Sequence, residues 1–198
     1  METVDLTNAV AHLRSGGIVV YPTGSVLAAG VLATDPVAVG RLAELVARPA
    51  GKPFGVIVAD LADLASLDLA LGEIERRLAD HFWPGALSLI LTVSPDSPLA
   101  AAYPGGTVAV RIPPHAVARG LARAVGGPVT ATSANRSGRP PVTTAEGLGP
   151  WWREAGAHIL PGEAGGLAPS TVVDCRSGEV EIIRPGRLPR EVLMAALK

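Results

Sequence analysis

Short apolar runs alternate along this chain with longer segments in which apolar residues recur every three or four positions. The short runs predict buried strands, and the longer spacing predicts amphipathic helices. We predict strands over residues 17–21, 54–58, 86–93, 107–112, 170–175 and 179–183, and a further strand that leads into Thr130–Gly138. We predict helices over residues 5–14, 35–46, 62–82 (with a break near Gly72), 115–125, 144–156 and 188–198.

The order of these elements indicates an α/β protein. Strands alternate with helices in the first part of the chain, whereas 170–175 and 179–183 pair locally around Ser177-Gly178. This order favours a twisted sheet of mixed parallel and antiparallel strands with flanking helices. We expect one domain over residues 1–198, because neither a linker nor an internal repeat interrupts the pattern.

Composition narrows the class of protein further. A hydrophobic fraction of 48% with 18% charged residues is typical of a folded chain. The net charge is only −1, so any contact with nucleic acid must come from a local basic patch. A single cysteine, Cys175, excludes a disulfide framework and a multi-cysteine zinc site. We expect a cytoplasmic protein without membrane contact, since neither a signal peptide nor an apolar run of about 18 residues is present.

The stretch Thr130–Gly138 places hydroxyl and amide side chains at the end of a predicted strand. Such a segment, with its backbone N–H groups, suits a bound phosphate or carboxylate. It could equally be an Asx or Ser/Thr turn that satisfies only its own backbone. The residues of this stretch leave both interpretations open.

Four cations lie at or beside predicted strand ends and within two residues of Pro or Gly, namely Arg48, Lys52, Arg111 and Arg184. Ligands of α/β sheets gather at the carboxyl ends of strands, so these cations could share one cleft. Their convergence would indicate a polyphosphate ligand, although each arginine could also belong to an ordinary turn or solvated face.

The familiar catalytic motifs are absent from the sequence. It contains no P-loop, no G-x-G-x-x-G fingerprint, no S-x-x-K and no G-x-S-x-G. The four histidines lie far apart, without metal-ligand spacing. The pattern therefore predicts a site that binds and orients its reactants rather than one with a dedicated nucleophile.

Seven motifs follow one another in an order and spacing that resemble a known family: Gly17–Thr23, Arg48–Pro53, Trp83–Gly85, Val108–Pro113, Thr132–Gly138, Ser170–Asp174 and Ile183–Gly186. Together they are similar to the YrdC/Sua5 family of threonylcarbamoyl-AMP synthases. The resemblance covers residues 17–186 and implies a YrdC-like twisted sheet with a concave, positively charged cleft.

The resemblance also implies an activity and a site. ATP, L-threonine and bicarbonate would give threonylcarbamoyl-AMP and pyrophosphate for the t6A modification of tRNA, with Mg²⁺ carried mainly by the phosphates. The product would pass to the t6A-transfer machinery, with possible contact to tRNA. The implied ATP-binding residues are Arg48, Lys52, Thr107, Ser133, Asn135 and Arg184. The implied threonine-binding residues are Ser25, Arg111 and Ser170.

Two departures from the family pattern fall in this site. The usual P-T-[DE]-T-x-Y-G-L motif is altered over Gly24–Ala28, and the usual K-x-R-P motif has Val46 in place of lysine. These changes leave two alternatives open. One is a divergent paralogue that binds nucleotide without this activity. The other is a module for double-stranded RNA, which would use a basic cluster drawn from Arg136, Arg139, Arg184, Arg187 and Arg190.

Overall fold

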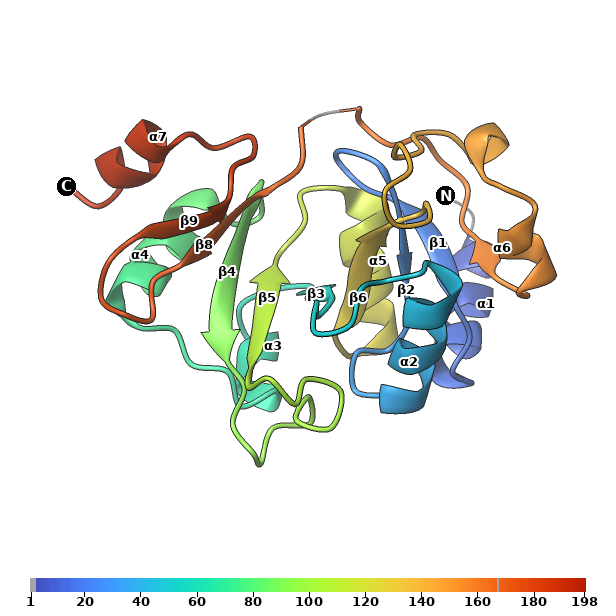
Figure 1. The fold of residues 1–198 in the computed structure, drawn as a ribbon, viewed down its shortest axis with the longest axis horizontal. Helices are drawn as coiled ribbons and strands as arrows, with labels where there is room; N and C mark the ends of the chain where they lie inside the picture. Colours follow the sequence, from blue (N-terminus) through green and yellow to red (C-terminus); the bar gives the residue numbers. More distant parts are fainter. Residues whose placement is uncertain (1–2, 167) are drawn as a thin grey trace.

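Nine strands join in one mixed sheet in the computed structural model, which describes residues 3–166 and 168–198. The strands are β1 Val19–Pro22, β2 Leu27–Gly30, β3 Gly55–Ile57, β4 Leu87–Thr92, β5 Thr107–Arg111, β6 Val129–Ser133, β7 His158–Ile159, β8 Thr171–Asp174 and β9 Glu181–Arg184. Their order in the sheet is β7-β1-β2-β6-β3-β5-β4-β8-β9. The predicted α/β class with a mixed sheet is confirmed (Figure 1).

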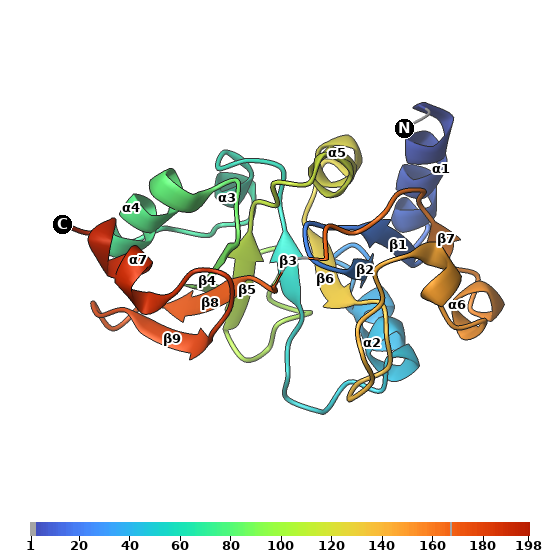
Figure 2. The same cartoon turned by 90° about the horizontal axis from the view of Figure 1, so that it is seen from above.

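Helices flank the sheet on both sides. They are α1 Thr3–Arg14, α2 Pro36–Leu45, α3 Asp63–Ser66, α4 Glu73–Phe82, α5 Ala116–Val125, α6 Trp151–Glu154 and α7 Arg190–Ala195, with a 3₁₀ turn at Ala145–Gly147. Figure 2 shows α3, α4 and α5 along one side of the sheet and α2 on the other. The break predicted near Gly72 is confirmed, because Gly72 is the N-cap of α4.

Two strands were missed by the sequence prediction. β2 consists of small apolar residues directly after a turn, without alternation, yet it pairs with both β1 and β6. β7 has only two residues, and its pairing with β1 comes from a distant part of the chain. Both strands depend on tertiary contacts more than on local pattern.

Alternation along the strands separates a core face from a polar face. Leu87, Leu89 and Leu91 of β4 join an apolar cluster that includes residues of β5, β8, α3 and α4. Since side chains alternate along a strand, Ser88 of β4 and Arg111 of β5 lie on the opposite face. The strands around this cluster therefore have one buried face and one face open to a cleft.

Strand directions bring two of the predicted cations to one edge of the sheet. β5 is antiparallel to β4, β4 is parallel to β8, and β8 is antiparallel to β9, so β5 and β9 run the same way. Arg111 and Arg184 end these two strands. A register shift pairs Val172 with Arg184 but Val173 with Ile182, which sends Ile182 to the core and Arg184 to the cleft face.

Candidate active site

Arg111 is held by a main-chain carbonyl. Its Nε donates a hydrogen bond of 2.8 Å to the carbonyl oxygen of Gly85. A Cβ on Gly85 would lie 1.9 Å from the carbonyl oxygen of Phe82, so this turn requires glycine. One predicted motif, Trp83–Gly85, therefore orients the cation of another.

Arg184 and Ser170 form a second fixed group at the same edge. Nη2 of Arg184 donates to the carbonyl oxygen of Ser170 at 2.8 Å and to its hydroxyl oxygen at 3.2 Å. The Ser170 hydroxyl lies 2.9 Å from that of Ser88. Gly186 packs so closely behind Ser170 that a Cβ there would lie 2.5 Å from its carbonyl carbon. The predicted ATP residue Arg184 and the predicted threonine residue Ser170 thus belong to one hydrogen-bonded unit.

Arg184 acts electrostatically on two other arginines, Arg48 and Arg111. Burial lowers the pKa of Arg111, Tyr21 opposes this effect, and Arg184 lowers the pKa further. Burial also lowers the pKa of Arg48, with Tyr103 opposing it and Arg184 again adding to it. Half-buried guanidinium groups that repel one another create a positive potential, which an anionic ligand would relieve. The structure therefore brings both Arg48 and Arg111 within electrostatic reach of Arg184.

Arg48 closes the loop that carries Lys52. Its Nε donates to the carbonyl oxygen of Lys52 at 2.6 Å, and its Nη2 donates to that of Pro53 at 2.5 Å. The guanidinium group lies 4.2 Å from the ring centroid of Phe54. A weaker contact of 3.5 Å joins Nη1 to the Thr132 hydroxyl. Lys52 itself is exposed, and its ammonium group has no hydrogen bond or ion pair within the described part of the chain.

The turn between β1 and β2 folds toward Arg111. A Cβ on Gly24 would lie 4.0 Å from Nη2 of Arg111. Ser25 is buried, and its hydroxyl lies 3.4 Å from that of Thr23. The amide of Gly165 donates to the carbonyl oxygen of Thr23 at 3.0 Å, so the segment before β8 crosses this turn. The altered motif thus lies beside the arginine predicted to meet the amino-acid carboxylate.

The stretch Thr130–Gly138 serves two purposes. Thr130 is fully buried, and its hydroxyl accepts a hydrogen bond from the amide of Val31, which makes it part of the sheet. Nδ2 of Asn135 donates to the carbonyl oxygens of Arg136 and Arg139, so this side chain closes its own loop. Oδ1 of Asn135 is buried and has no partner among the described residues. The turn interpretation therefore accounts for Nδ2 of Asn135, whereas Oδ1 remains available to accept a hydrogen bond from a ligand.

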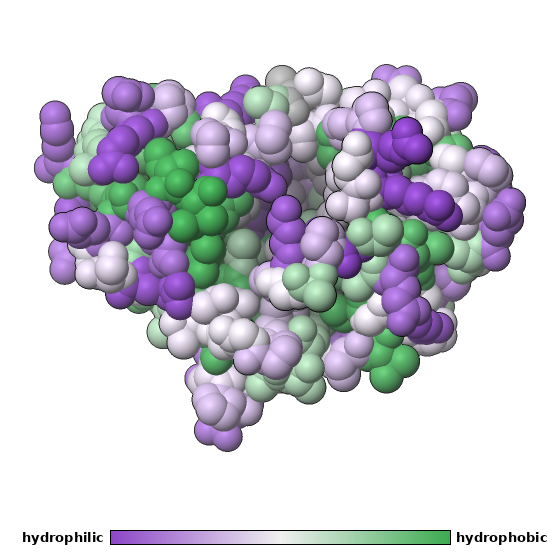
Figure 3. Space-filling view, in the orientation of Figure 1, coloured by the Kyte–Doolittle hydropathy of each residue, from purple (hydrophilic) through white to green (hydrophobic). Residues whose placement is uncertain are grey.

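The other predicted residues lie at the margins of this group. Ser133 ends β6 and pairs with Ala28 of β2. Thr107 begins β5 on the same strand face as Arg111, four residues away, which corresponds to roughly 13 Å. The cleft therefore extends along β5 rather than forming a compact pocket. Figure 3 shows the molecular surface hollowed near the centre of this view, with hydrophilic side chains around the hollow.

The departures from the family pattern have a structural explanation different from the one we expected. Val46 is 2% exposed and packs in an apolar cluster with Leu42 and Phe54, so its side chain does not face the cleft. Leu27 and Ala28 are also buried, in β2. Both side chains pack in the core, so these two changes of the motif do not alter the wall of the cleft.

Sequence reasoning missed two hydroxyl groups. Ser88 could have been found from strand alternation, because it is the polar residue between Leu87 and Leu89 in an otherwise apolar run. Tyr103 has no comparable signal. It is 2% exposed, its hydroxyl has no partner among the described residues, and burial raises its pKa while Arg48 opposes that rise.

The described side chains contain no group of three or more His, Cys, Asp or Glu residues placed to hold a metal ion. In the same residues, none of the helices is long and apolar enough to cross a membrane.

Fold and cleft define an α/β protein that gathers several arginines and hydroxyls over one open sheet face, which suits an anionic ligand. The chain belongs to the Sua5/YciO/YrdC family, whose model, described as "Telomere recombination", matches residues 11–186. It is similar to the threonylcarbamoyl-AMP synthase of Stenotrophomonas maltophilia, at 38% identity over 91% of this chain and 98% of that protein.

Two longer relatives extend the comparison. The threonylcarbamoyl-AMP synthase of Bacillus subtilis is 35% identical over 97% of this chain, which spans 56% of that protein's length. The crystal structure of P. abyssi Sua5 complexed with L-threonine superimposes with a TM-score of 0.89 and 32% identity, covering 100% of this chain and 58% of that one. The expected family and its YrdC-like fold are therefore confirmed.

Proposed function

We propose that this chain is a threonylcarbamoyl-AMP synthase that uses ATP, L-threonine and bicarbonate and releases pyrophosphate. The observation that carries the proposal is the group formed by Arg48, Arg111 and Arg184, with the Ser170 hydroxyl bonded to Arg184. The curated relatives with this name, including the Stenotrophomonas protein of nearly the same length, support it.

The chemistry asks the protein to bind and orient anions. The amine of threonine and bicarbonate form a carbamate with loss of water, and a carbamate oxygen then attacks the α-phosphate of ATP while pyrophosphate leaves. Both reactants are negatively charged, so cations must offset their repulsion and hold them in line. Arginine side chains supply charge and directional N–H groups without a dedicated nucleophile.

We assign the substrates to the two ends of the cleft. Lys52 and Arg48 hold the triphosphate, with Thr107, Ser133 and Asn135 beside the nucleotide. Arg111 holds the carboxylate of threonine, between Ser25 and Ser170. Arg184 belongs with the ATP-binding residues in this assignment. Its bond to Ser170 and its electrostatic effect on both Arg48 and Arg111 support a place between the two substrates.

Mg²⁺ would enter as part of the ATP complex. Phosphate oxygens and water are its preferred ligands in such complexes, and this assignment needs no cluster of protein carboxylates. The product would be consumed by a transfer step on tRNA in the cytoplasm.

Pyrophosphate release tests the proposal. ATP, bicarbonate and threonine together should release pyrophosphate, and leaving out threonine should stop the release. Clear ATP binding without threonine-dependent release would contradict the synthase and favour a divergent nucleotide-binding paralogue. Serine in place of threonine is a useful matched control for the amino-acid pocket.

A further inference from the structure

Ser88 places a hydroxyl group on an otherwise apolar strand. It is 7% exposed, and its hydroxyl oxygen lies 2.9 Å from that of Ser170. Ser170 is its only hydrogen-bond partner among the described residues. Either hydroxyl could be the donor at this distance. We take Ser88 as the donor, because a buried hydroxyl proton needs an acceptor and the Ser88 hydroxyl has no other acceptor among the described residues.

This bond decides where the Ser170 proton points. A serine hydroxyl has one proton and two acceptor positions. Nη2 of Arg184 donates to one of these positions at 3.2 Å, and with Ser88 taken as the donor of the serine pair the other position is filled as well. With both acceptor positions filled, the Ser170 hydroxyl can only donate, and it has no further acceptor among the described residues, so its proton remains for a ligand. Ser170 is thereby prepared for an oxygen rather than for an ammonium group.

Strand register places Ser88 beside the arginine predicted to bind the amino-acid carboxylate. The β4–β5 pairing sets Leu89 opposite Val110, and continuing it by one residue sets Ser88 opposite Arg111. Ser88 thus lies between the arginine predicted to bind the amino-acid carboxylate and the serine predicted to contact the same substrate.

We propose that Ser88 is a positioning residue for the amino-acid substrate, which acts by directing the Ser170 hydroxyl proton toward a carboxylate or carbamate oxygen. This inference rests on the proposed function and on the assignment of Ser170 to the threonine pocket. It extends the site to a residue of β4 that need not touch the substrate.

The experiment measures threonine binding by calorimetry in the presence of a non-hydrolysable ATP analogue and bicarbonate. We expect Ser88→Ala to weaken threonine binding about tenfold, as the loss of one hydrogen bond predicts. Affinity for the ATP analogue should stay within about twofold. Ser88→Thr keeps the hydroxyl and should bind threonine nearly as the unchanged protein does.

A double substitution separates positioning from general damage. If Ser88 acts through Ser170, adding Ser88→Ala to Ser170→Ala should have no further effect on threonine affinity. Ser97→Ala is the matched control, because Ser97 is also buried but donates to the carbonyl oxygen of Leu67, outside the cleft residues. It should leave threonine affinity unchanged.

Three outcomes would overturn the proposal. They are an unchanged threonine affinity in Ser88→Ala, additive losses of threonine affinity in the double variant, or a loss of affinity for the ATP analogue as large as the loss for threonine. Failure of the unchanged protein to bind threonine would overturn it as well. Threonine binding without pyrophosphate release would instead contradict the synthase function and leave the Ser88 result valid.

Discussion

The two halves of the cleft hold their cations in different ways. The sheet-edge half comprises Arg111 and Arg184 with their partners Gly85, Ser88 and Ser170. The loop half comprises the 48–53 loop, the β1–β2 turn and the stretch Thr130–Gly138. In the sheet-edge half, Arg111 and Arg184 bond to residues 26 and 14 positions away in sequence. In the loop half, Arg48 bonds to carbonyls only four and five positions away.

This difference concerns the stability of each half. Contacts that join distant segments exist only while the sheet is intact, so the sheet-edge half is as stable as the fold. A loop closed by its own arginine can open locally at a smaller cost in free energy. The amino-acid end of the proposed site is therefore preformed, whereas the triphosphate end depends on one loop.

Gly85→Ala should have the largest effect on stability, because it displaces the backbone that holds the sheet-edge half. The new Cβ would lie 1.9 Å from the carbonyl oxygen of Phe82, so the turn must move and Arg111 loses its acceptor. We expect a loss of about 3 kcal/mol in the free energy of unfolding, measured by denaturant titration. Gly105→Ala is the control, since a Cβ there would meet nothing within 4 Å. Equal stability of the two variants would contradict a rigid sheet-edge half.

Arg48→Lys should open the loop half while leaving the fold in place. A lysine cannot donate to both carbonyls in the fork geometry that arginine provides. We expect about a tenfold loss in ATP affinity with a loss of only about 1 kcal/mol in stability, measured by calorimetry and thermal unfolding. Arg77→Lys, on the exposed side of α4, should change neither quantity. A loss of stability as large as that of Gly85→Ala would remove the distinction between the halves.

Lys52→Ala should have a smaller effect, confined to the ligand. The Lys52 side chain is exposed and has no partner in the described chain, so its removal should leave the free energy of unfolding unchanged. Because an exposed charge is well screened, we expect only about a three- to tenfold loss in ATP affinity. Lys198, the other lysine of the chain, provides the control substitution to alanine. Unchanged ATP affinity in Lys52→Ala would show that the triphosphate assignment is wrong.

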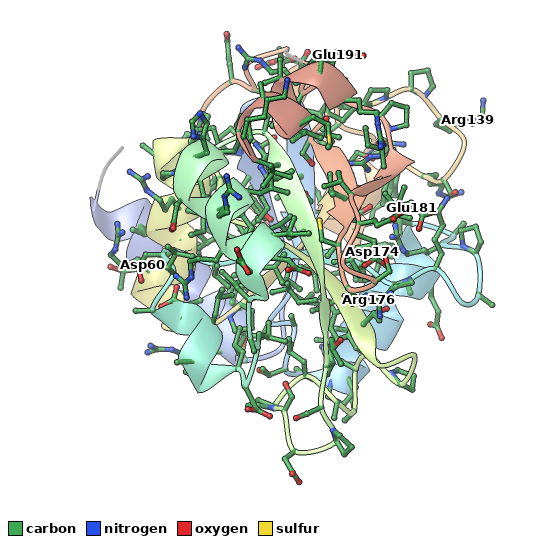
Figure 4. The ribbon with its side chains drawn as sticks, turned by 90° about the vertical axis from the view of Figure 1, so that its left-hand side faces the viewer. Asp60, Arg139, Asp174, Arg176, Glu181 and Glu191 are labelled. Atoms are coloured by element: carbon green, nitrogen blue, oxygen red, sulfur yellow. The ribbon has the colours of Figure 1, made fainter. Side chains whose placement is uncertain are left out.

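Asp174→Asn should have the smallest effect on stability, and it should change ligand binding in neither half of the cleft. Hydrogen bonds from Arg176 lower the pKa of Asp174, the last residue of β8, and Figure 4 shows the two residues close together. A depressed carboxyl pKa stabilises the fold above the unfolded value of about 3.9 and loses this contribution as pH falls. We expect the variant to be less stable by under about 1 kcal/mol at pH 7, with the gap closing as the pH falls below the unfolded pKa of the carboxyl group. A change in ATP or threonine affinity would contradict its independence from the cleft.

Sequence patterns predicted the parts of this protein that are local. Strands such as β4 and β5 were found because a long apolar run needs burial. The motifs at the ends of β5 and β9 placed Arg111 and Arg184. β7 was missed because two residues carry no periodicity. The burial of Val46 follows from the pattern of its own helix, because Leu42 lies one turn earlier and packs in the same apolar cluster. The bond between Arg184 and Ser170 depends on the register shift at Val172, which cannot be predicted from the pattern of residues.

The partner of Arg111 is a main-chain oxygen, and every amino acid carries one. No exchange of a side chain can delete this acceptor, so evolution cannot remove it by altering a partner residue. Selection on the contact must act instead on Gly85, whose missing Cβ lets the turn pack against Phe82. We expect related sequences to show an invariant glycine here and no position that co-varies with the arginine.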